Sequence, residues 1–157
     1  MPKVTARYWW FALSGAIVLG DQLSKWWVIA TMQLYQRIEL LPFLQLTYVH
    51  NKGAAFSFLS DAGGWQHLFF VAIASLASIA LSYWLWRVPA ALRWQACAFA
   101  LILGGAIGNL IDRLRYGYVI DFIDFYVRQW HWPVFNLADS AITLGVAALC
   151  LDILRKD

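Results

Sequence analysis

Four long apolar stretches, separated by short polar segments, organise this chain. They cover about residues 8–30, 65–86, 94–113 and 134–154. Each is about as long as the roughly 20 residues that an α-helix needs to cross a bilayer. The pattern therefore predicts an all-α integral membrane protein with four transmembrane helices, built as a single membrane domain over residues 1–157.

The polar segment at about 33–64 is expected to lie outside the membrane. It contains a run of β-forming residues at 43–49, a turn signal at 51–53 (Asn-Lys-Gly) and a second short run at 54–59. This order predicts a small antiparallel β element. Because two strands alone are only marginally stable in water, the element is expected to rest on the membrane surface.

The polar segment at about 116–132 is expected to lie at the same outer surface. It mixes aromatic and branched residues with two acids, Asp121 and Asp124, a composition typical of an interfacial amphipathic segment. On a helix these two acids, three residues apart, would face roughly the same side. Composition does not choose which of these two acids is functional.

Composition supports the membrane assignment. Hydrophobic residues make up 62% of the chain and charged residues 13%, whereas a soluble domain carries about 25% charged residues. This excludes a disordered chain, a nucleic-acid-binding module and an ordinary water-soluble enzyme. Lysine and arginine are densest in the short segments before the first stretch, between the second and third, and after the fourth. That placement predicts that both termini lie inside the cell.

Ionisable side chains within an apolar stretch are candidates for function, because a charge at the membrane centre costs about 2.5–3.5 kcal/mol. Asp21 and Lys25 are four residues apart and share one face of the first predicted helix, so we interpret them as a structural ion pair. Lys25 also adjoins Trp26 and Trp27, and its ammonium group is expected to reach the outer interface.

The third stretch ends in a polar group. Gly104 and Gly108 form a small-xxx-small face that lets helices approach closely, and Asn109 and Arg113 stack on one face. An amide and a guanidinium can bind the carbonyl groups of a peptide, which favours a binding role. An ordinary polar helix end is the alternative.

The fourth stretch begins with Asn136 and Asp139, a spacing typical of a helix N-cap. Asp121 and Asp139 both fall near the outer ends of the last two stretches, and a short connection separates them. Two carboxylates that share one proton perform aspartyl hydrolysis. The sequence therefore leaves two interpretations of Asp139, a capping residue or one member of a hydrolytic pair. No metal site is predicted, because cysteines and histidines are scattered.

Five motifs resemble, in the same order, those of the lipoprotein signal peptidase (signal peptidase II) family. They are DQLSK at 21–25, HNKGAAFS at 50–57, GGAIGNLIDR at 104–113, VIDF at 119–122 and FNLADS at 135–140. The resemblance implies an aspartic endopeptidase of the bacterial inner membrane, with four transmembrane helices, both termini cytoplasmic and its active site near the periplasmic face. Such an enzyme removes the signal peptide from a diacylglyceryl-modified prolipoprotein by cleaving before the lipidated cysteine. It needs no metal or cofactor, binds no nucleic acid and is expected to bind the cyclic peptide inhibitor globomycin.

The resemblance also implies roles for individual residues. The catalytic dyad maps onto Asp121 and Asp139. Asp124 lies outside the matching VIDF motif and is then expected to be a solvated surface acid. Substrate-binding positions map onto Asn51, Asn109, Arg113 and Asn136, and supporting positions onto Asp21, Lys25, Gly53, Gly104, Gly108 and Asp112. Within the dyad, Asp139 is expected to be the more acidic member, because the positive end of a helix stabilises an anion, and Asp121 is expected to carry the shared proton.

Two other classes of membrane protein are alternatives to this interpretation. A small proton- or cation-coupled transporter would also place aspartate and arginine in the membrane, but here the polar residues gather at one interface. A non-catalytic scaffold has no use for two convergent carboxylates beside asparagine and arginine.

Overall fold

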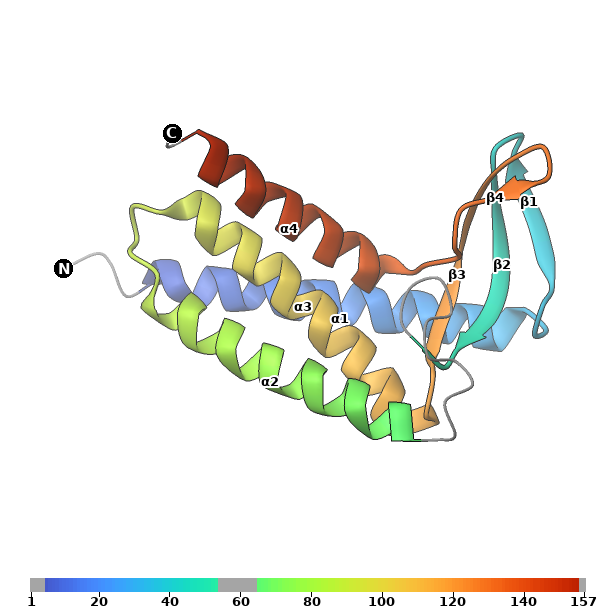
Figure 1. Ribbon diagram of the computed structural model, residues 1–157, viewed down its shortest axis with the longest axis horizontal. Coiled ribbons are helices and arrows are strands. Elements are labelled where there is room, and N and C mark those ends of the chain that lie inside the picture. The colour runs from blue at the N-terminus through green and yellow to red at the C-terminus, as the bar shows by residue number, and fades with distance from the viewer. Residues whose placement is uncertain (1–4, 54–64, 156–157) are drawn as a thin grey trace.

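In the computed structural model, which describes residues 5–53 and 65–155, four helices form a bundle and a small sheet lies at one end of it (Figure 1). The elements are α1 (Thr5–Thr31), β1 (Arg37–Leu41), β2 (Leu44–Asn51), α2 (Trp65–Arg87), α3 (Arg93–Tyr116), β3 (Val119–Val127), β4 (Trp130–His131) and α4 (Leu137–Leu154). Each predicted apolar stretch forms a helix whose ends lie within a few residues of the predicted limits.

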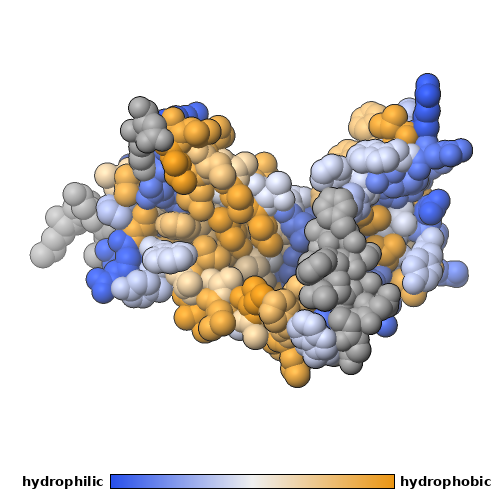
Figure 2. All heavy atoms as spheres, in the orientation of Figure 1, coloured by the Kyte–Doolittle hydropathy of each residue, from blue (hydrophilic) through white to orange (hydrophobic). Residues whose placement is uncertain are grey.

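Three of the described helices have the length and composition of membrane spans. These are α2, α3 and α4, with 23, 24 and 18 residues. Their outer surfaces expose large apolar side chains such as Leu68, Ile79 and Leu144, and Figure 2 shows a continuous hydrophobic surface over the bundle that gives way to polar residues at the sheet. α1 is longer, at 27 residues, but contains both Asp21 and Lys25.

Helix α3 lies at the centre of the bundle and packs against α1, α2 and α4. Small residues allow this close approach. A β-carbon on Gly104 would lie 2.8 Å from the Ile17 side chain, and one on Gly108 would lie 2.6 Å from Asp21 Oδ2. These two glycines therefore face α1. A β-carbon on Gly105 would instead collide with the backbone carbonyl oxygen of Ala138 in α4.

The sheet is antiparallel, with its strands in the order β1-β2-β3-β4. One side of it packs against the end of α1. The buried residues of this contact are Val28, Met32, Tyr48, Ile120 and Phe122. The sheet is thereby fixed to the end of the bundle at which α3 finishes and α4 begins (Figure 1).

The segment at 116–132 differs from the sequence-based expectation. It forms strands β3 and β4, so Asp121 and Asp124 do not share one face as they would on a helix. The first four residues of β3 are all buried, and a strand covered on both faces does not alternate between apolar and polar residues. The predicted strand at 54–59 lies outside the described residues, and β2 pairs with β1 and β3.

Replacing Gly105 with alanine should lower the free energy of unfolding by roughly 1–3 kcal/mol. The added methyl group meets the backbone of α4, which cannot turn away as a side chain can. The apparent Tm of the protein in detergent measures this loss.

Gly15→Ala is the matched control, since nothing lies within 4 Å of the added β-carbon. It should leave the Tm unchanged or raise it slightly, because alanine favours helix over glycine. An equal Tm for the two variants would contradict close packing of α3 on α4.

Candidate active site

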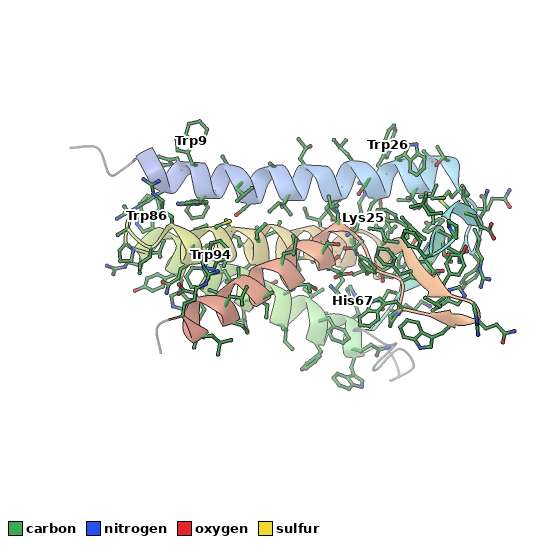
Figure 3. All side chains as sticks on the ribbon, turned by 90° about the horizontal axis from the view of Figure 1, so that it is seen from above. Trp9, Lys25, Trp26, His67, Trp86 and Trp94 are labelled. Atoms are coloured by element: carbon green, nitrogen blue, oxygen red, sulfur yellow. The ribbon has the colours of Figure 1, made fainter. Side chains whose placement is uncertain are left out.

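Lys25 is the centre of a buried charge cluster between α1 and α3. Its Nζ lies 2.8 Å from Asp21 Oδ2 and 2.8 Å from Asp112 Oδ2, and it donates to Asn109 Oδ1 at 3.0 Å. The ammonium group has three N–H donors, and these three acceptors use all of them. Lys25 is 1% exposed and points into the bundle (Figure 3). The expectation that it reaches the outer interface is therefore wrong.

Each carboxylate of this cluster also holds a second element in place. Asp21 Oδ1 accepts a hydrogen bond from the backbone N–H of Ala138 at 3.0 Å, in the first turn of α4. Asp112 Oδ2 accepts one from the backbone N–H of Ile120 at 3.0 Å, in β3. Gln22 adds a third link between α1 and α3, because its amide donates to Asp112 Oδ1 at 2.8 Å. The cluster thus fixes the start of α4 and the start of β3.

Gln22 was not singled out from the sequence, although it lies inside the first motif. The signal that could have found it is its position next to Asp21, in the predicted ion pair of Asp21 and Lys25. The Gln22 amide also donates to the carbonyl oxygen of Gly108 at 3.2 Å. Gly108 has no side chain, so α1 can approach this carbonyl group closely.

Asp121 is the third residue of β3 and is 1% exposed. Its Oδ1 accepts from the Asn136 amide at 2.7 Å, and its Oδ2 accepts from the Asn51 amide at 2.9 Å. Burial, and after it the nearby charge of Asp139, raises the pKa of Asp121 to about 7. The two amide hydrogen bonds favour the ionised form but do not outweigh burial.

Asp139 lies in the first turn of α4, three residues after the N-cap Asn136. The two residues form a capping box: the Asp139 N–H donates to Asn136 Oδ1 at 2.9 Å, and the Asn136 N–H donates to Asp139 Oδ2 at 3.3 Å. The other carboxylate oxygen, Oδ1, accepts from the Asn109 amide at 2.7 Å. Capping therefore uses one oxygen of Asp139, and the carboxylate still lies beside Asp121.

Asn109 and Asn136 connect the charge cluster to both carboxylates. Asn109 Oδ1 accepts from Lys25 and, at 3.1 Å, from the Asn136 amide, while Asn109 Nδ2 donates to Asp139. Asn136 is fully buried and also donates to the carbonyl oxygen of Ile120 at 3.2 Å. An ammonium group can only donate and an ionised carboxylate can only accept. The orientation of the Asn109 amide is therefore set by Lys25 on one side and Asp139 on the other.

Arg113 lies one turn beyond Asn109 on α3. Its guanidinium is 5.3 Å from the centre of the Phe70 ring. It donates to the carbonyl oxygens of Gly53 at 3.4 Å and Asn109 at 3.5 Å, both longer than the usual hydrogen bond. A guanidinium has five N–H donors, and within residues 5–53 and 65–155 Arg113 uses two of them, on these two carbonyl oxygens.

Asp124 is buried as well, contrary to the expectation of a solvated surface acid. It is 2% exposed and accepts from Gln45, Thr47 and His131 at 2.6, 2.8 and 2.9 Å. Burial raises the pKa of Asp124, but the hydrogen bonds, that from His131 first, outweigh it and hold the pKa below its usual range. Residues three apart on a strand face opposite sides, so Asp124 is turned away from the Asp121–Asp139 pair.

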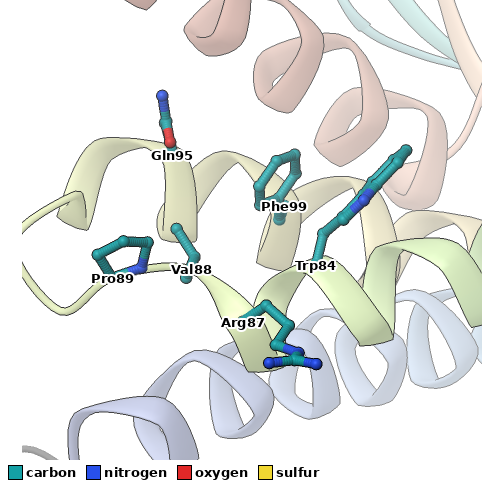
Figure 4. A pocket seen from close by; sticks show the side chains of 6 residues that line it. All are labelled: Trp84, Arg87, Val88, Pro89, Gln95 and Phe99. Atoms are coloured by element: carbon teal, nitrogen blue, oxygen red, sulfur yellow. The ribbon is translucent and has the colours of Figure 1, made fainter.

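Two other features do not belong to this site. Among residues 5–53 and 65–155, no three His, Cys, Asp or Glu side chains are grouped so that they could hold a metal ion. A hollow at the α2–α3 turn (Figure 4) is mainly apolar. It lies at the opposite end of the bundle from β3 and the start of α4, which carry the carboxylates (Figure 1). Its lining residues are Trp84, Arg87, Val88, Pro89, Gln95 and Phe99.

Comparisons with known proteins agree on one family. The family model described as signal peptidase (SPase) II matches residues 13–155. The lipoprotein signal peptidase of Alteromonas mediterranea is 54% identical over 96% of this chain and 81% of its own length, and that of Vibrio vulnificus is 50% identical over 96% and 89%. Two solved structures of a bacterial membrane enzyme, each 32% identical, superpose with TM-scores of 0.85 and 0.83. They cover 99% and 100% of this chain and 93% and 99% of their own chains.

The raised pKa of Asp121 makes stability depend on pH. Between about pH 4 and 7 an unfolded Asp121 has lost its proton while the folded one keeps it, so this residue lowers stability as the pH rises and adds no further change above about pH 7. The apparent Tm of Asp121→Asn in detergent should therefore rise relative to wild type across this range.

Glu39→Gln is the control, because Glu39 is an exposed acid on β1. It should keep the pH dependence of the wild type. A constant difference in Tm between wild type and Asp121→Asn from pH 4 to 8 would show that Asp121 ionises at its ordinary pKa.

Proposed function

This chain belongs to the signal peptidase II family of aspartic peptidases, which remove signal peptides from prolipoproteins, and we propose that Asp121 and Asp139 are its catalytic dyad. The observation that carries the proposal is the bridge between them. One buried asparagine, Asn136, donates its side-chain amide to Asp121 and its backbone N–H to Asp139. The charge of Asp139 acts on the buried Asp121, and two neighbouring carboxylates can retain one proton between them near neutral pH.

The two carboxylates would then act in different protonation states. In this proposal Asp139, in the first turn of α4, is the ionised member of the dyad and Asp121 holds the proton. Asp139 takes a proton from water as the water oxygen attacks the carbonyl carbon, and Asp121 gives its proton to the carbonyl oxygen. The C–N bond breaks as the nitrogen receives a proton from Asp139, and the diol returns its proton to Asp121. Both aspartates thereby return to their starting protonation states.

We propose different roles for the four residues expected to bind substrate. Arg113 makes two long hydrogen bonds to the part of the chain that the structure describes, and its guanidinium, with five N–H donors, would bind carbonyl groups of the signal peptide. Asn51 is half-buried beside Asp121, where it orients that carboxylate and borders the substrate. Asn109 and Asn136 are buried and use their amides within the network, so their role is to position Asp139 and Asp121.

We propose that α1 is a fourth transmembrane helix, so that the chain forms one membrane domain. The buried charges of α1 do not oppose this, because Asp21 and Lys25 are paired with each other and with Asp112, and membrane-buried charges are tolerated when they are paired. The short connection between α2 and α3 carries Arg87 and Arg93. By the positive-inside rule this end and both termini are cytoplasmic.

That orientation places the dyad and the sheet near the periplasmic face of the bacterial inner membrane. The substrate is then a diacylglyceryl-modified prolipoprotein, whose lipid chains lie in the bilayer against the apolar surface of the bundle, and cleavage occurs before the lipidated cysteine. Globomycin, a cyclic peptide inhibitor of the family, would occupy the same site. No metal is needed, because the two carboxylates and water supply every proton transfer.

Purified protein in detergent should cleave a diacylglyceryl-modified prolipoprotein in the presence of EDTA and leave the unmodified precursor intact. Asp121→Asn and Asp139→Asn should each lose at least about a thousandfold in kcat, because an amide cannot transfer the proton, and globomycin should block the wild type. Product analysis by mass spectrometry locates the cleaved bond.

Three results would each contradict one part of this proposal. Equal cleavage of both precursors would remove lipid recognition. An active Asp121→Asn or Asp139→Asn would remove that residue from the dyad. Loss of activity in EDTA that a divalent ion restores would require a metal.

A further inference from the structure

Strand β3 carries a second buried carboxylate on the face opposite Asp121. Asp124 is 2% exposed, and both of its oxygens are used: His131 lies 2.9 Å from Oδ1, and Gln45 and Thr47 donate to Oδ2 at 2.6 and 2.8 Å. An ionised carboxylate can only accept, so the Nδ1 of His131 is the donor. These four residues, called here the Asp124 clasp, join β2, β3 and β4.

Strand β2 contributes to both faces of β3 because of an irregularity in its pairing. Between Leu46 and Val49 it takes three steps where β3 takes two, from Ile123 to Asp121. One extra residue turns the side-chain alternation over. Gln45 therefore points to the face of Asp124, while Asn51, six residues later on the same strand, points to the face of Asp121.

The clasp also holds the segment that leads to the second proposed catalytic residue. His131 stacks on Tyr126 with ring centroids 5.5 Å apart, and the next residue, Trp132, donates its N–H to the Phe125 carbonyl oxygen at 2.8 Å. Further along, Phe135 accepts from and donates to Ile123 at 2.8 and 3.0 Å. Asn136, the N-cap of α4, follows directly.

We propose that the Asp124 clasp positions the two proposed catalytic carboxylates relative to each other, so that Asp124 and His131 are positioning residues for the peptidase. Asp121 lies three residues before Asp124, and the chain from His131 to Asn136 leads into the first turn of α4, which contains Asp139. The contact between Asp124 and His131 therefore closes the loop of chain that joins the two members of the dyad. This inference rests on the proposed function of Asp121 and Asp139.

A burial role alone does not account for the clasp. The side chain of His131 is 36% exposed, so it contributes little to a core, yet it supplies a directed hydrogen bond to a buried carboxylate. Small displacements of reacting groups lower turnover sharply, by as much as about a hundredfold per ångström. Removing the donor at 131 should therefore reduce kcat more than it reduces the affinity for substrate.

The test compares His131→Ala with His131→Asn on a diacylglyceryl-modified prolipoprotein. The Nδ2 of asparagine is separated from the backbone by the same number of bonds as the Nδ1 of histidine, so it can donate to Asp124, whereas alanine cannot. His131→Ala should lose about tenfold or more in kcat with KM changed less than about threefold. His131→Asn should recover most of that loss, and Thr47→Val, which keeps its shape but loses the O–H donor, should fall between them.

Assays are run well below the Tm of each variant, so that loss of folded protein does not contribute. Glu39→Gln, which removes an exposed carboxylate on the same sheet, should turn over like the wild type. If His131→Ala and His131→Asn have equal kcat, or if His131→Ala matches the wild type, the clasp does not position the dyad. An inactive wild type, or an active Asp121→Asn, would instead overturn the proposed function, so the two failures are distinguishable.

Discussion

The ammonium group of Lys25 imposes the constraint on which the rest of the structure depends. A buried charge is stable only when its donors are all matched by well-placed acceptors, and Lys25 meets this condition with Asp21, Asp112 and Asn109. These partners hold further groups in place: Asp21 accepts from the first turn of α4 with its other oxygen, Asp112 accepts from the start of β3 with the oxygen that contacts Lys25, and the Asn109 amide donates to Asp139. Pairing one cation thus fixes the two elements, β3 and α4, that carry the proposed dyad.

Two buried aspartates of β3 have pKa values that are shifted in opposite directions, because their neighbours differ. Asp121 and Asp124 are both on β3 and both buried, but they face opposite sides. Asp124 accepts hydrogen bonds from three side chains, one of them the imidazole of His131, whereas Asp121 lies next to the charge of Asp139. Burial therefore favours the protonated form of Asp121, and hydrogen bonding favours the ionised form of Asp124. One acid is suited to proton transfer and the other to holding strands together.

Much of this could be predicted from the sequence, because it depends on local patterns. Long, mainly apolar stretches indicate the four helices, and the spacing of Asn136 and Asp139 indicates the cap that α4 has. Two features could not be predicted. The nine residues of β3 hold acids three apart, which is compatible with one face of a helix, and burial on both sides removes the alternation that would have indicated a strand. The burial of Lys25 depends on Asp112 and Asn109, more than 80 residues away in the chain.

The central claim is that a buried network holds Asp121 and Asp139 so close that one proton is shared between them near neutral pH. The pH dependence of kcat/KM of the wild type on a diacylglyceryl-modified prolipoprotein tests it most directly, because it reports the ionisation of essential groups in the free enzyme. The account predicts a value that falls with rising pH through a midpoint near pH 7, where Asp121 loses its proton. A kcat/KM that stays constant or increases from pH 6 to 9 would contradict it.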